Sequence, residues 1–421
     1  MKKTGLIILC LLFIVACKEE KKNIVQSDCV LIGEVHDRVD DSIVLIKFPD
    51  DMRINYTKIP IVDGKFEHSF KSEAPQAYTL IFNGDYNNGG GMIFNFFSER
   101  DTVRIDIYSE DHSKTNVDGG VVNQEMSKYN AQVQDKFESR KSKYYAINDS
   151  LINENKYWSV RASEIFEELQ KKGVDKRSLY KELESLRENG RGDLSDVAKG
   201  FNQELEKIND ENTEFKYEYL ENNYSILSYY HLLSDLKYDN NNVLSNEKLN
   251  SYSNKFSEKH PNHPYNNMLS KEIEALINMK PGGDFLDFEA EDAEGNLVKA
   301  SEKIKGKYAV LNLWASWCGP CVEHSIELKP VYEKFKDKGF TVLSVAREDD
   351  NTNAMNKMIE RFKFPWFNLI DLDGQYDVWN TYGISNAGGA IFFYDDKGKV
   401  ILVNPEIKEI EEQLSVLLEN K

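Results

Sequence analysis

A Cys-x-x-Cys motif placed directly after an apolar segment restricts the fold of this chain more than any other feature. The segment is Tyr308–Trp314, and the motif is Cys318-Gly319-Pro320-Cys321. A short apolar run predicts a buried strand, and a proline at the third motif position fits the first turn of a helix, where its missing N–H is not needed. The motif is therefore predicted to lie at a strand-to-helix junction, with the first sulfur at the helix N-terminus.

That position favours redox chemistry of the two sulfurs. Backbone N–H groups and the helix dipole stabilise a thiolate at a helix N-terminus. Cys318 is the candidate nucleophile that attacks a substrate disulfide, and Cys321 is the candidate resolving thiol that releases the product from the mixed disulfide. The alternatives are half of a zinc site or a structural disulfide, but a four-ligand zinc site usually needs a second cysteine pair or paired histidines. The other candidate catalytic residues are Trp317, Gly319, Pro320 and His324.

The residues after the motif alternate between strand and helix patterns. Beyond a helix that begins near Gly319, we predict a strand at 340–346, helices at 352–362 and 374–382, a hairpin of strands 390–394 and 400–403, and a closing helix at 407–418. Such alternation is typical of an α/β fold. The unit is predicted to span residues 281–421.

The motif, together with the stretch from about residue 282 to the C-terminus, resembles the thioredoxin-fold thiol–disulfide oxidoreductases of the TlpA/ResA type. Asp284-Phe285 and the turn at 294–296 fit the N-terminal hairpin of that family. The resemblance implies an α/β thioredoxin-like fold, a redox-active disulfide between Cys318 and Cys321, and an enzyme that needs no cofactor and no metal. A reducing role is implied by analogy, because Cys-Gly-Pro-Cys resembles thioredoxin more than the strong oxidants.

Three positions differ from thioredoxin or from its relatives. Asn312 stands where thioredoxin has a buried acid, and it cannot accept the proton of Cys321. His324 stands where ResA-like proteins have a glutamate, and a histidine can act as a base near neutral pH; a solvent-facing histidine is the alternative. Residues 386–389 read Asn-Ala-Gly-Gly where the family has a cis-proline. We therefore expect the peptide bond before the last strand pair to be trans or the loop to be rebuilt, and we expect altered substrate selectivity. A weaker alternative is that the exposed sulfurs bind a metal.

The first residues predict an exported chain. Two lysines precede an apolar run at 5–16 that is too short for a comfortable membrane span, and Ile-Val-Ala before Cys17 resembles the lipobox of bacterial lipoproteins. The resemblance implies a signal peptide at 1–16, lipidation of Cys17 and a charged tether at 17–29. We expect a lipid-anchored protein of the cell envelope that faces the periplasm, or that lies on the outer-membrane surface. An ordinary signal peptide is the alternative.

Two further regions precede the redox domain, and both resemble the extensions of Bacteroidetes lipoprotein members of the family. Residues 30–120 contain several short strand patterns and an Asp-Gly turn at 63–64, which predict a small antiparallel β domain. His36 and His68 are predicted to serve surface or core packing rather than metal ligation.

Residues 121–280 are predicted to form a mainly helical region. Apolar and tyrosine side chains recur there at helical spacing, which indicates a packing stripe rather than a ligand platform. His260 and His263 fall in a proline-rich turn, and no cysteine or carboxylate pattern completes a metal site around them.

Composition restricts the partners. The chain has 71 acidic and 53 basic residues, which argues against a nucleic-acid surface. The expected substrates are exported proteins with disulfides or dithiols, and the expected electron donor is a membrane protein.

Cys29 is expected to be a spectator, although pairing between molecules is an alternative. Two competing functions remain: a degenerate thioredoxin-like lipoprotein that binds a client or a glycan without redox turnover, and a peroxidase, whose Thr-x-x-Cys arrangement this chain lacks.

Overall fold

The computed structural model describes residues 27–99, 101–238, 244–384 and 388–418. The predicted signal peptide, the predicted lipidation site Cys17 and most of the predicted tether lie outside these residues. Among the residues described, no helix is both long and apolar enough to cross a lipid bilayer.

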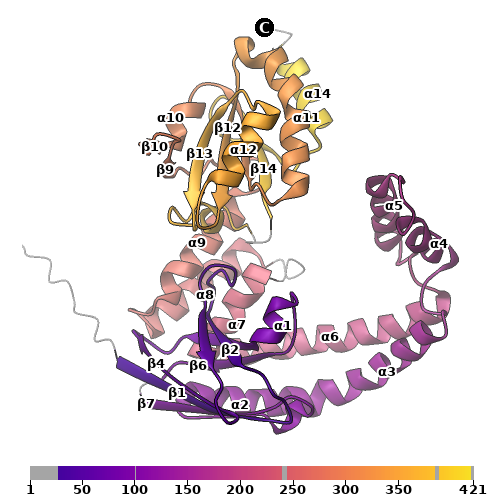
Figure 1. Cartoon of the computed structure of the whole chain (residues 1–421), viewed down its shortest axis with the longest axis vertical. Coiled ribbons are helices and arrows are strands. Elements are labelled where there is room, and N and C mark those ends of the chain that lie inside the picture. Colours follow the sequence, from indigo (N-terminus) through magenta and orange to yellow (C-terminus); the bar gives the residue numbers. More distant parts are fainter. Residues whose placement is uncertain (1–26, 100, 239–243, 385–387, 419–421) are drawn as a thin grey trace, which may run out of the picture.

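Three parts of the chain are arranged around a central group of helices. In Figure 1 the C-terminal α/β domain stands on this group, and the N-terminal strands lie below it. The central helices are α7 (Ile226–Tyr238), α8 (Asn246–Lys259) and α9 (Tyr265–Asn278). Two long helices project to one side as an arm, and a short helix pair lies at its end (Figure 1). The arm consists of α3 (Ser139–Asn153) and α6 (Asp196–Asn223), and the pair of α4 (Val160–Leu169) and α5 (Lys176–Glu188).

The N-terminal region folds into two four-stranded sheets, of orders β4-β1-β7-β8 and β3-β2-β5-β6. Apolar side chains from both sheets, among them Leu31, Leu80 and Val103, are fully buried between them. The prediction of a β domain is thereby confirmed. The strands are β1 (Ser27–His36), β2 (Ser42–Lys47), β3 (Thr57–Pro60), β4 (Lys65–Ser72), β5 (Ala77–Phe82), β6 (Ile93–Phe97), β7 (Asp101–Tyr108) and β8 (Asn116–Asp118), with a short helix, α1 (Asn83–Asn87), after β5.

Two details of this region differ from the expectation. β1 and β7 run parallel, so the domain is not purely antiparallel. The turn at Asp63-Gly64 has positive φ at both residues, as the Asp-Gly pair predicts. However, β3 before it and β4 after it belong to different sheets, so the turn carries the chain from one sheet to the other.

The helical region packs on its tyrosines and leucines, as expected. Tyr229 and Tyr265 are fully buried in one core with Leu232 and Leu269. The chain enters this region through α2 (Val121–Val133), which continues into α3 through a π-helical turn at Gln134–Glu138. The Gly-Arg-Gly segment at 190–192 lies between α5 and α6, and residues 239–243 lie outside the described residues.

The C-terminal domain is a seven-stranded sheet of order β10-β9-β13-β12-β11-β14-β15, covered by helices on both faces. Its core lies partly between the sheet and α11, α12 and α14, and partly between the sheet and α10 and α13. This arrangement confirms the predicted α/β thioredoxin-like fold. Its elements are β9 (Glu289–Glu291), β10 (Leu297–Lys299), α10 (Ala300–Ile304), β11 (Tyr308–Trp314), α11 (Gly319–Phe335), β12 (Phe340–Glu348), α12 (Asn353–Phe362), β13 (Phe367–Leu372), α13 (Val378–Thr381), β14 (Ala390–Tyr394), β15 (Val400–Val403) and α14 (Ile407–Leu418).

Candidate active site

The two cysteines of the motif lie where the sequence predicts them, between the central strand β11 and helix α11. Cys318 is the N-cap residue of α11, and Pro320 follows in its first turn. Cys318 and Cys321 form a disulfide with an S–S distance of 1.92 Å. Cys318 is half-buried, whereas Cys321 is only 9% exposed. A partner can therefore reach the first sulfur more easily than the second.

A pocket of about 500 Å³ opens beside this disulfide. It is lined by both cysteines, Trp317 and His324, and by Gly388, Gly389 and Pro405. Trp317 is 40% exposed, although tryptophan carries a large apolar surface. All six predicted site residues, Cys318, Cys321, Trp317, Gly319, Pro320 and His324, line this one pocket.

The Gly388-Gly389 pair, where the resemblance implied a proline, lies directly before β14. A Cβ atom on Gly389 would lie 1.9 Å from the Leu313 carbonyl oxygen and 3.1 Å from Cys321 Sγ, so only glycine fits. Gly388 has no such neighbour within 4 Å. Its carbonyl oxygen accepts a hydrogen bond of 2.7 Å from the Trp379 indole N–H. The backbone therefore packs directly on the buried sulfur, without a side chain between them.

Asn312 lies on β11 behind the disulfide and is 1% exposed. Its amide nitrogen donates to Ser325 Oγ at 2.9 Å and to Ser344 Oγ at 3.2 Å. Ser325 Oγ in turn donates to the Cys321 carbonyl oxygen at 2.9 Å. A neutral hydrogen-bond network thus fills the place of the buried acid of thioredoxin.

A buried carboxylate that the sequence reasoning missed supports the segment before Cys318. Glu348, the last residue of β12, is 3% exposed and accepts hydrogen bonds from the Ser316 amide at 2.7 Å and its hydroxyl at 2.6 Å. Burial raises the pKa of Glu348, although the hydrogen bonds from Ser316 oppose this effect. The charged run Arg347-Glu348-Asp349 at the end of an apolar strand was the available signal, because such residues are rarely buried without a partner.

The loop between β2 and β3 also reaches this site, which the sequence did not indicate. Arg53 of this loop places its guanidinium carbon 4.4 Å from the centre of the Trp317 ring. Asp51 forms an ion pair with Arg347 at 2.6 Å. A separate contact, between Lys181 of α5 and Glu406, joins the helical arm to the residue after Pro405 at 2.8 Å. The N-terminal domain therefore contacts Trp317 beside the redox pair, and the helical region contacts the redox domain at Glu406.

The single histidines and the third described cysteine have other surroundings. His260 Nε2 and His263 Nε2 each lie 2.9 Å from a backbone carbonyl oxygen, of Tyr224 and of Pro75 respectively. His68 stacks on Phe70. Cys29 is buried on β1 and has no disulfide partner among the described residues, and burial raises the pKa of its thiol.

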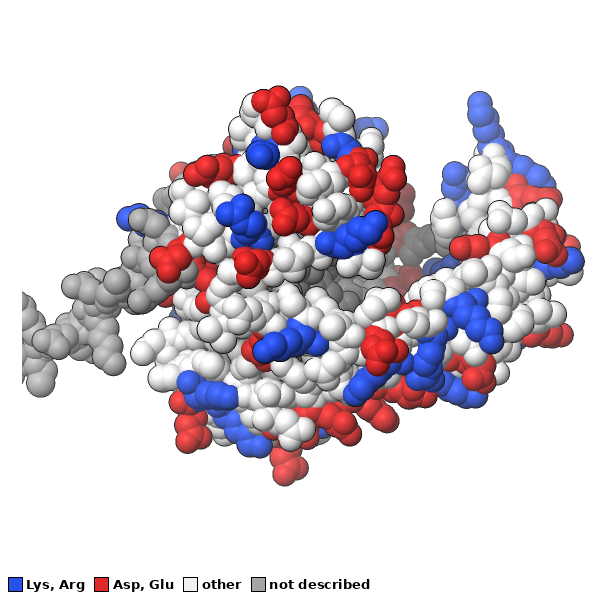
Figure 2. Space-filling model, turned by 90° about the horizontal axis from the view of Figure 1, so that it is seen from below, with Lys and Arg blue, Asp and Glu red and all other residues white. Residues whose placement is uncertain are grey.

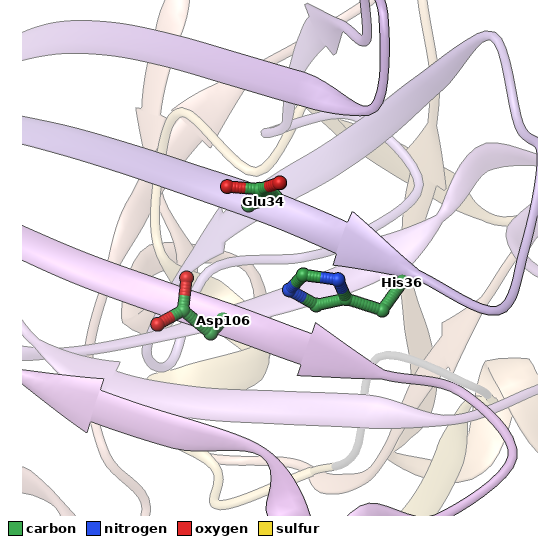
Figure 3. Close-up of side chains that lie close together, drawn as sticks. All are labelled: Glu34, His36 and Asp106. Carbon is green, nitrogen blue, oxygen red and sulfur yellow. The ribbon is translucent and has the colours of Figure 1, made fainter.

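His36 was expected to serve packing alone, but the structure places it in a possible metal-ligand group. Strand register brings Glu34 of β1 opposite Asp106 of β7, and the ligand atoms of Glu34, His36 and Asp106 all lie within 4.8 Å of one another (Figure 3). The His36 ring stacks on Tyr108 at 4.3 Å, and Lys65 Nζ lies 3.9 Å from a Glu34 oxygen. A metal there would have to displace this ion pair.

On the face seen in Figure 2, basic and acidic side chains are mixed.

Comparison with known proteins gives matches to two parts of the chain. A family model described as Redoxin matches residues 280–417, and a model described as a domain of unknown function, DUF4369, matches residues 29–126. The thioredoxin domain of a thiol-disulfide oxidoreductase from Bacteroides vulgatus is 26% identical, covers 33% of this chain and 98% of its own, and gives a TM-score of 0.30.

Two curated relatives match with higher identity. The thiol-disulfide oxidoreductase ResA of Bacillus cereus is 30% identical over 158 residues, which are 37% of this chain and 83% of the relative. The protein of the same name from Bacillus thuringiensis subsp. konkukian is 30% identical over 144 residues, 33% of this chain and 78% of the relative. This chain therefore belongs to the ResA family of thiol-disulfide oxidoreductases, and its thioredoxin-like domain is the part that it shares with them.

Proposed function

We propose that this enzyme reduces disulfides of exported proteins through Cys318 and Cys321. The observation that carries the proposal is the position of an accessible Cys318 at the N-terminus of α11, bonded to a buried Cys321 on the rim of an open pocket. The helix N-terminus stabilises Cys318 as a thiolate in the reduced enzyme. The half-exposed Cys318 sulfur then reacts with the substrate, whereas the buried Cys321 sulfur reacts only with Cys318.

The reaction proceeds in two exchanges. The Cys318 thiolate attacks one sulfur of the substrate disulfide, so that a Cys318–substrate bond forms and the other substrate sulfur leaves as a thiolate. The Cys321 thiolate then attacks Cys318 Sγ, which releases the second substrate thiolate and forms the Cys318–Cys321 disulfide. The substrate gains two electrons and the enzyme loses two. A dithiol donor, proposed to be a membrane protein, restores the reduced pair.

We propose His324 as the group that takes up the Cys321 proton. It lines the same pocket as both sulfurs, and Asn312 has no basic atom to offer. Replacement of His324 by Gln should change the pH dependence of product release from the mixed disulfide, with little change in the first exchange. If each of the two steps has the same pH profile in the wild type and in His324→Gln, His324 does not take part in the mechanism.

Trapping of the mixed disulfide tests the central claim. Reduced Cys321→Ser should accumulate a covalent adduct with a disulfide-bonded peptide, detected by mass spectrometry, because the resolving thiol is absent. Cys318→Ser should form no adduct. If neither variant forms an adduct and the wild type reduces no disulfide, a client-binding protein without redox turnover becomes the better interpretation.

The direction of electron flow is a separate measurement. Titration of the free thiols in glutathione buffers gives the reduction potential of the pair. A value near about −270 mV, as in thioredoxin, fits a reductant, whereas a value near about −120 mV fits an oxidant.

Placement of the enzyme in the cell envelope by lipidation of Cys17 is also proposed. A Cys17→Ser variant should lose both lipid labelling and its membrane fraction.

A further inference from the structure

The loop at 48–56, which joins β2 to β3 in the N-terminal domain, is fixed by charge to the redox domain. We call it the docking loop. Asp51 is 6% exposed, and its carboxylate binds Arg53 of the same loop and Arg347 of β12. Burial favours a higher pKa for Asp51, but the hydrogen bonds and charges of Arg53 and the charge of Arg347 outweigh it and lower the pKa. The carboxylate is therefore ionised at neutral pH, and its pairing with Arg53 orients that side chain.

Arg53 continues from this anchor to the redox motif. Its Nη2 lies 2.8 Å from Asp51 Oδ2, and its guanidinium lies over the Trp317 ring, 4.4 Å from the ring centre. A guanidinium at this distance is attracted to the negative face of an indole. Trp317 precedes Cys318 directly and forms part of the pocket wall. The N-terminal domain thus contacts the side chain that adjoins the exposed sulfur.

The end of β12 connects the docking loop with the backbone of the motif. Arg347 binds Asp51 of the docking loop, and the next residue, Glu348, binds both the amide and the hydroxyl of Ser316. Successive residues of one strand thus hold the loop from the N-terminal domain and the residue two positions before Cys318. A shift of the docking loop would therefore change the contact of Arg53 with the Trp317 ring and, through Arg347 and Glu348, the position of Ser316 next to Trp317.

Contacts elsewhere hold the domains together without Arg53. Lys237 Nζ of α7 donates to Asn380 at 2.8 Å, and Lys271 of α9 forms an ion pair with Asp377. These contacts join the redox domain to the helical region independently of the contact between Arg53 and Trp317.

We propose that Arg53 is a positioning residue for disulfide exchange, so that the N-terminal β domain supplies part of the redox site. Arg53 holds the Trp317 ring beside Cys318. Asp51 and Asp349 offset much of the charge of Arg53, so its effect on Cys318 goes through the position of the ring. The inference rests on the proposed function of Cys318 and assigns to the DUF4369 region a role in the reactivity of that sulfur.

The test measures the rate of Cys318 alkylation by iodoacetamide as a function of pH in the reduced full chain. Arg53→Ala should react about two- to fivefold more slowly near neutral pH, the range expected for loss of one cation–π contact. Arg53→Lys should recover most of the rate, since an ammonium also binds an indole face. The matched control is Arg38→Ala, because Arg38 likewise lies over an aromatic ring, Phe82 at 4.2 Å, but in contacts with its own domain.

The outcomes separate this inference from the proposed function. Equal alkylation profiles for wild type, Arg53→Ala and Arg38→Ala overturn the role of Arg53 while leaving Cys318 chemistry intact. Failure of the wild type to reduce any disulfide overturns the proposed function instead. If Arg53→Ala does not fold, Arg53→Lys and Arg53→Met decide the question, because both keep a long side chain over the ring and only Met lacks the charge. Equal profiles for Lys and Met also overturn the proposal.

Discussion

Asp51 and Arg347 lie 296 positions apart in the chain and form a buried ion pair, with 2.6 Å between Oδ2 and Nη2. Their side chains are 4% and 5% exposed. Removal of Asp51 takes this counter-ion from the buried Arg347 and also takes the carboxylate that binds Arg53, whereas exposed ion pairs contribute little. The pair therefore couples the stability of the N-terminal and redox domains.

Asp51→Ala should lower the free energy of unfolding by about 3 kcal/mol, as urea denaturation would measure it. The matched control is Glu411→Ala, which removes the exposed ion pair with Lys334 and should cost less than about 1 kcal/mol. Asp51→Ala combined with Arg347→Met should recover part of the loss, because the double variant no longer buries the Arg347 charge. Equal losses for Asp51→Ala and Glu411→Ala would contradict this account.

The glycine pair opposite the sulfurs gives a second prediction. Gly389→Ala should lower the free energy of unfolding by at least about 2 kcal/mol, because its Cβ would overlap the Leu313 carbonyl and crowd Cys321 Sγ. Gly388→Ala is the control and should change stability by less than about 1 kcal/mol, since nothing lies within 4 Å of its Cβ. Thermal unfolding of the two oxidised variants measures the difference, and similar midpoints would show that the loop moves freely.

The local patterns predicted the redox domain well. β11 and α11 begin at Tyr308 and Gly319, as expected, and Leu328, Val331 and Phe335 of α11 are buried at helical spacing. Apolar runs and helical spacing are local signals, so they can be read from the sequence. Strand β13 was missed because its residues, Phe367–Leu372, alternate between buried and half-buried without a clear boundary.

The relations between distant segments could not be predicted in this way. The cysteine motif identified its own pocket residues, but nothing in the spacing of Asp51 or Arg53 indicated a contact with Trp317. The parallel pairing of β1 with β7 and the hydrogen bonds of Glu348 with Ser316 likewise depend on the complete fold. Periodicity reports which face of an element is buried, but not which partner it meets.

His263 predicts a dependence of stability on pH. Burial lowers the pKa of His263 to about 4; its contact with the Pro75 carbonyl opposes this effect, and the charge of His260 adds to it. Protonation is therefore easier in the unfolded chain, where the pKa is about 6.5, than in the folded one. Stability due to neutral His263 is present above about pH 6.5 and is lost as the pH falls toward about 4, up to about 3 kcal/mol.

The measurement compares wild type with His263→Gln by urea denaturation between pH 7 and pH 4. Glutamine does not titrate, so the wild type should lose stability relative to the variant as the pH falls. The comparison also removes the effect of His231, whose pKa burial lowers to about 3 in both proteins. Parallel curves would contradict the assignment of the effect to His263.

Asn312 gives the last prediction, because its buried amide replaces an acid that thioredoxin carries. Asn312→Asp places a carboxyl group among Ser325, Ser344 and the backbone of Cys321, where burial raises a carboxyl pKa. A raised pKa in the folded state means that the variant is closest to wild type in acid and loses stability as the pH rises through that value. We expect a loss of at least about 2 kcal/mol between pH 5 and pH 8, from urea denaturation of the oxidised protein.

Asn312→Ala distinguishes the charge from the lost hydrogen bonds. It should cost about 1–3 kcal/mol at every pH, because it leaves Ser325 and Ser344 without their donor and adds no titrating group. If both variants lose the same stability throughout this range, the carboxyl group has reached solvent and the site is not closed behind Cys321. If only Asn312→Asp depends on pH, the neutral hydrogen-bond network is a requirement of the buried position behind Cys321.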